Sequence, residues 1–126
     1  MTDSEFIYPL TTEPYVFVGK KPAAVLFGTE RVEAKSWRDV YAAIITRCNN
    51  DPQHHETLMY LRNKVAGKIR VFLSDKTDGM TRPLKIDERM YAETHYGSAT
   101  LMHILVKRIL APTRFDCSNI SIVIRS

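Results

Sequence analysis

A polar cluster near Gly97 contains the residue types in this sequence that are best suited to ligand binding. The stretch Tyr91–Leu110 predicts a short strand, a tight turn at Gly97 and a helix that Ser98 caps through its hydroxyl. The first turn of a helix presents unpaired N–H groups and the positive end of the helix dipole, which together bind anions such as phosphate. Three further polar side chains crowd the same point: His95, Tyr96 and Thr100. We therefore expect an anion-binding helix start, although an ordinary strand–turn–helix joint with a good cap has the same pattern.

Basic side chains in the second half of the chain would extend such a site. The net charge is +4 and the pI is near 9.2; residues 67–126 hold ten basic and six acidic side chains, and residues 1–66 hold eight of each. Two windows are free of acids. Their basic and histidine side chains are Arg62, Lys64, Lys68 and Arg70 in the first, and His95, His103, Lys107, Arg108 and Arg114 in the second. This asymmetry favours a polyanionic partner, most simply nucleic acid. The alternative is a solvated basic face that keeps the protein in solution.

Two aromatic side chains are candidates for stacking on exposed nucleobases. Tyr96 lies in a turn beside Gly97, which suits this role. Trp37 stands at the head of an apolar helical stripe, so we expect it to belong to the core.

Metal ligands with a suitable spacing are missing from the sequence. His54 and His55 are adjacent, so on a helix their side chains point about 100° apart. Cys48 and Cys117 form no CxxC pair. We expect two reduced thiols, no metal site and no cofactor.

Catalytic motifs are also missing. No GxSxG elbow surrounds Ser98, and the acids Asp87, Glu88 and Glu93 do not follow the pattern of metal-dependent nucleases. We expect that the protein is not an enzyme. A pocket built by residues distant in sequence is the alternative that stays open.

The elements that must position these residues follow the order strands, two helices, strands, helix, strand. Strands are expected at 15–18, 23–27, 31–34, 69–73, 83–86, 90–94 and 120–124, and helices at 36–48, 52–67 and 99–111. This order predicts an α+β fold, with a mostly antiparallel sheet and about three helices packed on it. We expect residues 1–13 to form a loosely ordered tail and residues 14–126 to form a single domain.

The location of the protein is predicted from what the sequence lacks. No apolar run approaches the roughly 20 residues that span a membrane. The first residues include Asp3 and Glu5, where a secretory signal would carry basic residues. We expect a cytoplasmic protein that does not associate with a membrane.

Several motifs together resemble a small accessory domain that is attached to bacterial restriction and other mobile-defence proteins. The motifs are Ser36-Trp-Arg-Asp-Val, Asn50-Asp-Pro52, Arg82-Pro-Leu-Lys-Ile and Met90-Tyr-Ala-Glu-Thr-His-Tyr-Gly-Ser-Ala-Thr before an apolar helix. The resemblance covers residues 16–124, and its motifs are caps, turns and apolar faces. It implies a domain that contacts DNA or a partner protein and lacks catalysis, here without an attached nuclease or methylase.

These observations lead to one functional hypothesis and one alternative. The hypothesis is a non-catalytic module that binds nucleic acid through phosphates, using the Gly97–Ser98 helix start and the basic side chains named above. The alternative is a protein-interaction module, or a small regulator or inhibitor that acts on a partner protein.

Overall fold

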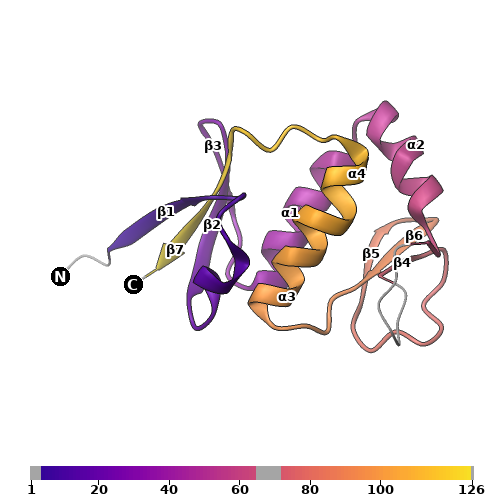
Figure 1. The fold of residues 1–126 in the computed structure, drawn as a ribbon, viewed down its shortest axis with the longest axis horizontal. Helices are drawn as coiled ribbons and strands as arrows, with labels where there is room; N and C mark the ends of the chain where they lie inside the picture. Colours follow the sequence, from indigo (N-terminus) through magenta and orange to yellow (C-terminus); the bar gives the residue numbers. More distant parts are fainter. Residues whose placement is uncertain (1–3, 65–71, 126) are drawn as a thin grey trace.

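The fold consists of two antiparallel sheets with helices between them (Figure 1). The structure is a computed structural model that describes residues 4–64 and 72–125. The strands are β1 (Glu5–Pro9), β2 (Lys21–Phe27), β3 (Glu30–Glu33), β4 (Leu73–Ser74), β5 (Pro83–Asp87), β6 (Met90–Glu93) and β7 (Ile120–Arg125). The helical segments are η1 (Pro14–Phe17), α1 (Trp37–Asn49), α2 (Pro52–Leu61), α3 (Ser98–His103), η2 (Ile104–Leu110) and α4 (Ala111–Thr113). The α+β prediction is confirmed, with the strands divided between two sheets.

The first two helices begin where the sequence indicates. The Ser36 hydroxyl accepts the N–H of Asp39 at 3.1 Å and caps α1. The Asp51 carboxylate accepts two N–H groups at the start of α2, and Pro52 follows it. The predicted apolar face of α1 is buried at Val40, Tyr41, Ile44, Ile45 and Cys48. Helix α2 ends at Leu61, before Gly67, which lies outside the described residues.

The larger sheet has the strand order β1-β7-β2-β3, so the C-terminal strand β7 lies inside it, as its apolar sequence predicts. Gly28, with φ of +64°, makes the turn between β2 and β3. The guanidinium of Arg31 on β3 contacts the carboxylate of Glu5 on β1 at 3.1 Å. Because β1 and β3 are the two edge strands, this ion pair links the two edges of the sheet through long side chains.

The smaller sheet has the order β4-β6-β5. Its β5–β6 hairpin matches the predicted pair of strands around the turn at residues 87–89. Of the strand predicted at 69–73, residues 69–71 lie outside the described residues, and β4 covers Leu73–Ser74.

The last helix is continuous from Ser98 to Thr113, but its middle part, η2, is wound as a π-helix. The helix was predicted to end at residue 111, and it ends two residues later, after Thr113, where Arg114 adopts the left-handed conformation. Pro112 has no N–H for the carbonyl of Arg108, so a regular α-helical pattern is interrupted there.

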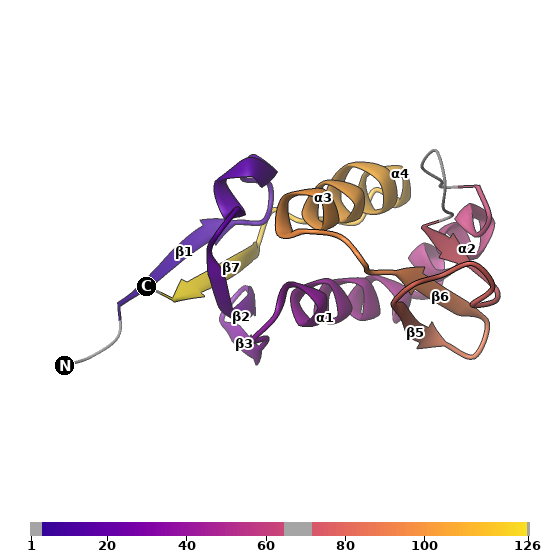
Figure 2. The same cartoon turned by 90° about the horizontal axis from the view of Figure 1, so that it is seen from below.

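One hydrophobic core joins the two sheets through the helices. Figure 2 shows α1 and the α3–α4 helix side by side between the larger sheet and the smaller one. The core contains Ile122 from the larger sheet, Ile44 and Leu105 from the helices, and Met90 from the smaller sheet, and all four are fully buried. A small second cluster, Ala23, Ala24 and Val123, lies in the larger sheet.

The N-terminal segment differs most from the sequence prediction. Residues 5–9, expected to belong to a loosely ordered tail, form the edge strand β1, because Phe6 and Tyr8 pair with the apolar residues Ile124 and Ile122 of β7. The strand predicted at 15–18 is wrong. Pro14 starts the short 3-10 helix η1 there, and Phe17 turns into the core.

Candidate nucleic-acid interface

The predicted helix start has a different hydrogen-bond pattern from the one expected. Gly97 is the N-cap of α3, and its carbonyl accepts the N–H of Leu101 at 2.9 Å. Ser98 is the first helical residue, and its hydroxyl donates to the carbonyl of Phe17 at 3.3 Å. The prediction that Ser98 caps the helix is therefore wrong, because a tertiary acceptor in η1 takes the hydroxyl.

A small pocket lies beside this helix start, lined by Arg82, Thr94, His95, Tyr96 and Gly97. It brings together three of the predicted residues with Arg82, which the sequence analysis did not single out. The fully buried carboxylate of Glu93 accepts the N–H of His95 at 2.9 Å, so this backbone donor is already used. A phosphate here would also lie close to that negative charge.

Tyr96 and Arg108 meet through an aromatic side chain that the sequence analysis also missed. Tyr96 is half-buried and contacts Phe72 edge-on, with ring centroids 5.8 Å apart. The guanidinium of Arg108 lies 5.5 Å from the centroid of the same Phe72 ring. The structure therefore places Tyr96 against the core and Arg108 beside it.

The remaining predicted cations do not converge on one place. Lys107 is exposed on η2, and Arg114 is exposed after α4, roughly 25 Å along the helix from Gly97. Arg62 donates to the carbonyls of Met59 and Arg89, at 3.2 and 2.8 Å.

Of the three other predicted cations, the structure describes only Lys64. Lys64 donates to the carbonyl of Tyr60 at 3.0 Å and lies over its ring. Lys68 and Arg70 lie outside the described residues.

Several acidic side chains in the described part of the chain form ion pairs with basic side chains of the same chain. Glu5 and Glu33 pair with Arg31, Glu30 pairs with Arg47, and Glu88 pairs with Lys85. The Arg31 hydrogen bond holds the pKa of the Glu5 carboxyl below its usual value, so Glu5 stays charged and paired.

A second group of cations gathers at the end of the larger sheet, which the sequence analysis did not identify. An open hollow of about 560 Å³ is lined by Phe6, Tyr8, Gly19, Lys20, Lys21, Ile124 and Arg125. None of the lining residues is acidic, and no ion pair joins Lys20, Lys21 or Arg125 to any residue that the structure describes. We call Phe6, Tyr8, Lys20, Lys21 and Arg125 the sheet-end surface.

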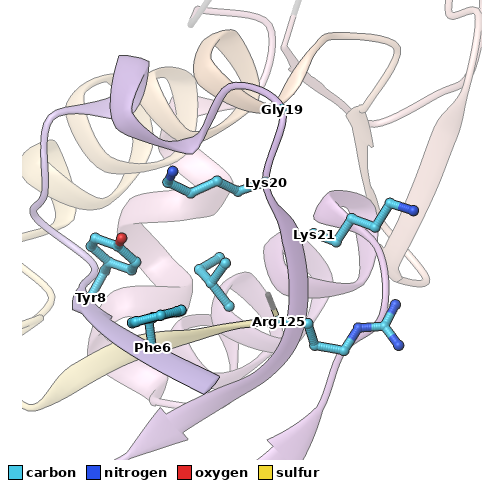
Figure 3. A pocket seen from close by; sticks show the side chains of 7 residues that line it. Phe6, Tyr8, Gly19, Lys20, Lys21 and Arg125 are labelled. Carbon is cyan, nitrogen blue, oxygen red and sulfur yellow. The ribbon is translucent and has the colours of Figure 1, made fainter. Parts of the chain in front are cut away.

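Figure 3 shows how the side chains of the sheet-end surface are arranged. Phe6, Tyr8 and Lys20 surround the hollow, whereas Lys21 and Arg125 project to the other side of the strand. The floor includes Ile124, which is buried. The end of the strands therefore carries cations on both sides and an apolar, aromatic hollow on one.

Exposed apolar side chains are concentrated in the same N-terminal segment. Among the described residues, five large hydrophobic side chains are exposed, and four of them lie between residues 6 and 18: Phe6 (52%), Ile7 (61%), Tyr15 (72%) and Val18 (63%). Figure 1 shows that the outer ends of β1 and β7 project past the helices, and Phe6 belongs to β1. An apolar patch next to unpaired cations is typical of an interaction surface.

The wall of the hollow is held in place by three contacts from other elements. Phe17 is fully buried between the rings of Tyr8 and Trp37, with centroids at 6.0 and 5.1 Å. The indole N–H of Trp37 donates to the carbonyl of Lys20 at 3.0 Å, and Ser98 donates to Phe17. Trp37 is thus half-buried, and it anchors the loop that carries Lys20.

Local sequence signals for the sheet-end surface were weak. The run Phe6-Ile-Tyr8 alternates like a strand, and Lys20-Lys21 is a basic pair, but the two are separated by Pro9 and Pro14. Only the pairing of β1 and β2 with the C-terminal strand β7 brings them together.

His54, His55 and Cys48 line neither of these two pockets. His55 Nδ1 lies 2.7 Å from the amide oxygen of Asn49, and His54 packs edge-on against Phe115. No group of three metal-ligating side chains occurs within residues 4–64 and 72–125. Burial raises the pKa of the Cys48 thiol to about 11, so it is protonated at neutral pH and a poor nucleophile.

None of the helices within residues 4–64 and 72–125 is long and apolar enough to cross a bilayer.

No protein-family model, curated protein or solved structure matches the chain. The resemblance to an accessory domain of restriction and mobile-defence proteins therefore stays a prediction from the sequence.

Proposed function

We propose that this protein is a non-catalytic module that binds nucleic acid through backbone phosphates. The observation that supports this most is the sheet-end surface, where Lys20, Lys21 and Arg125 lie beside the exposed ring of Phe6 and form no ion pair with any carboxylate that the structure describes. Cations that no acid neutralises attract a polyanion, and binding would release the counterions condensed on it. The defence or mobile-element setting rests on the sequence resemblance alone.

Two surfaces can carry the phosphate contacts, and they make separable predictions. The first is the sheet-end surface. The second is the helix face proposed from the sequence, with Lys107, Arg108 and Arg114. We favour the first, because the pocket at Gly97 includes a used backbone donor and lies near Glu93.

The test is a fluorescence titration of short single-stranded and duplex DNA at several salt concentrations. The parent protein should bind with an affinity that falls steeply with salt. The double variant Lys20→Glu, Lys21→Glu should lower the affinity and reduce the salt slope by about two units, one for each lost phosphate contact.

Two further variants serve as controls in that titration. Lys76→Glu, Lys85→Glu makes the same change in net charge near the smaller sheet, and it should leave the slope almost unchanged. Lys107→Glu, Arg108→Glu, Arg114→Glu tests the helix face. If only this triple variant reduces binding, the phosphates bind at the helix instead. If the parent shows no salt-dependent binding, nucleic-acid binding is ruled out.

A protein partner is the second candidate function, and the exposed edge of β1 favours it. Phe6 and Ile7 are exposed on a strand with one unpaired edge, which is a template for pairing with a strand of another chain. Binding of that kind buries apolar surface and depends little on salt. Sedimentation at two protein concentrations, with Ile7→Lys as the variant, would detect self-association of this type.

A further inference from the structure

We infer that the hollow between Phe6, Tyr8 and Lys20 binds one base of a single-stranded nucleic acid. This inference rests on the proposed function and adds to it the site and the strand state of the ligand. Lys20 binds the phosphate next to that base, and Lys21 and Arg125 bind phosphates on the other side of the strand end.

The apolar part of the hollow suits a planar ring. Phe6 and Tyr8 pair with Ile124 and Ile122, so both rings lie on the face of the sheet that turns toward the core. Tyr8 is partly buried against Phe17 of η1, whereas the Phe6 side chain is half exposed. A base that stacks on Phe6 would cover this ring, and stacking tolerates any base because each has an aromatic face.

The charged part of the hollow suits a phosphate backbone. Lys20 reaches into the hollow, and Lys21 and Arg125 point to the opposite side (Figure 3). Within residues 4–64 and 72–125, the nearest acid in the strand register is Glu5, opposite Arg125, and Arg31 holds both oxygens of that carboxylate, at 3.2 and 3.1 Å. The cations therefore stay available to a strand that passes over the end of the sheet.

The site needs little rearrangement to accept a ligand. Gly19 has φ of +77° and makes the bend that directs Lys20 toward β1. The carbonyl of Lys20 is fixed by Trp37, and the N–H of Lys20 donates to Phe17 at 3.1 Å. A preformed wall lowers the entropy that binding must offset.

A duplex fits this arrangement poorly. Its bases are stacked on one another, so only their edges are accessible, whereas contact with the Phe6 ring requires an unstacked base. Single-stranded DNA and RNA share the base and the phosphate, and both belong to the inferred ligand class.

The experiment compares three probes on the full chain: a labelled oligothymidylate, an abasic oligonucleotide of equal length, and a duplex. The parent should bind the oligothymidylate more tightly than the abasic strand. Phe6→Ala should weaken binding of the oligothymidylate by roughly 5- to 100-fold, the loss of one stacked base, and leave the abasic strand unaffected. Lys20→Gln should weaken both.

Matched variants distinguish the loss of base stacking from a loss of folding. Tyr15→Ala removes another exposed ring outside the hollow and should change neither affinity. Phe6→Leu keeps an apolar side chain and removes the ring, so it should reproduce most of the Phe6→Ala effect. Circular dichroism and the urea midpoint report whether each variant is folded.

The outcomes distinguish this inference from the proposed function. If all three probes bind with a steep salt dependence and Phe6→Ala matches Tyr15→Ala, the base site is wrong and phosphate binding stands. If no probe binds, both are wrong. A concentration-dependent dimer that Phe6→Ala abolishes, with oligothymidylate binding unchanged, would also overturn the base site and assign the surface to self-association.

Discussion

Glu93 has no exposed surface, yet it stands where the smaller sheet leads into the helix start at Gly97. Its carboxylate accepts the N–H groups of Thr81, Arg82 and His95 at 2.7, 3.0 and 2.9 Å. Three donors to one charged acceptor stabilise the buried charge and tie two loops together. In the sequence, Glu93 fits no pattern of metal-dependent nucleases, and in the structure it binds three backbone N–H groups.

Glu93→Ala should lower the free energy of unfolding by roughly 3 kcal/mol, because it removes a charged acceptor and leaves three N–H groups without it. Glu93→Gln should cost less, since the amide oxygen still accepts. Urea unfolding is the measurement. Glu88→Ala is the control, as Glu88 is exposed in the β5–β6 turn and its loss should hardly move the midpoint. Equal effects of the two alanine variants would contradict the role of Glu93.

Asp87, the last residue of β5, binds the C-terminal end of α1 through Asn49 and the β5–β6 turn through Arg89. Burial alone would raise the pKa of its carboxyl, but the hydrogen bonds from the Arg89 N–H and the Asn49 amide, at 2.8 and 3.0 Å, outweigh it and lower the pKa. Because the folded pKa lies below the unfolded one, the charge stabilises the fold above the ordinary pKa of 3.8. That contribution is lost as the pH falls from there through the folded pKa.

Asp87→Asn should therefore be less stable than the parent at neutral pH, and the difference should shrink as the pH falls below about 4. The measurement is urea unfolding of both proteins across this range. A difference that stays constant at every pH would mean that the Asp87 charge does not contribute.

Among the elements, α1 and η1 show how far local patterns reach. The stripe of α1 predicted from the sequence is buried, because every third or fourth residue of a helix returns to the same face. The short η1 helix has no such stripe. Its position depends on Phe17, which packs between Tyr8 and Trp37, and on the Ser98 hydroxyl.

Ile44→Ala should lower the free energy of unfolding by roughly 2–5 kcal/mol, since Ile44 is fully buried in the middle of α1 and its loss leaves a cavity. Thr46→Ala is the matched control on the exposed side of the same helix, and it should leave the urea midpoint nearly unchanged. If both variants unfold at the parent midpoint, α1 does not pack as described.

At the scale of the whole molecule, the helices lie between two sheets that differ in what they offer to a partner. The smaller sheet is tied to α1 and α2 by hydrogen bonds from Arg38, Asn49 and Arg62. The larger sheet extends beyond the helices, and it carries the exposed side chains of Phe6 and Ile7 and part of the lining of the hollow. The basic residues that the structure describes between residues 72 and 125 are spread over β5, η2, β7 and the segments between the elements, so they do not form a single basic face.

The features that could be predicted from the sequence are those that depend on interactions between neighbouring residues. The cap at Ser36, the start of α2 at Pro52, the β2–β3 and β5–β6 hairpins and the buried face of α1 follow from contacts within a few residues, and they match the structure. The α+β class follows from the order of these elements.

The contacts between segments that are distant in the sequence could be identified from the tertiary structure alone. Strand β1 forms because β7, at the opposite end of the chain, presents Ile122 and Ile124 to it, and no local pattern encodes such a partner. For the same reason, the Ser98 hydroxyl donates a hydrogen bond to the Phe17 carbonyl and does not cap the helix as predicted. Packing places this acceptor next to the hydroxyl. The hollow at the sheet end is built from the same long-range pairings, with Phe6 and Tyr8 from one end of the chain and Ile124 and Arg125 from the other.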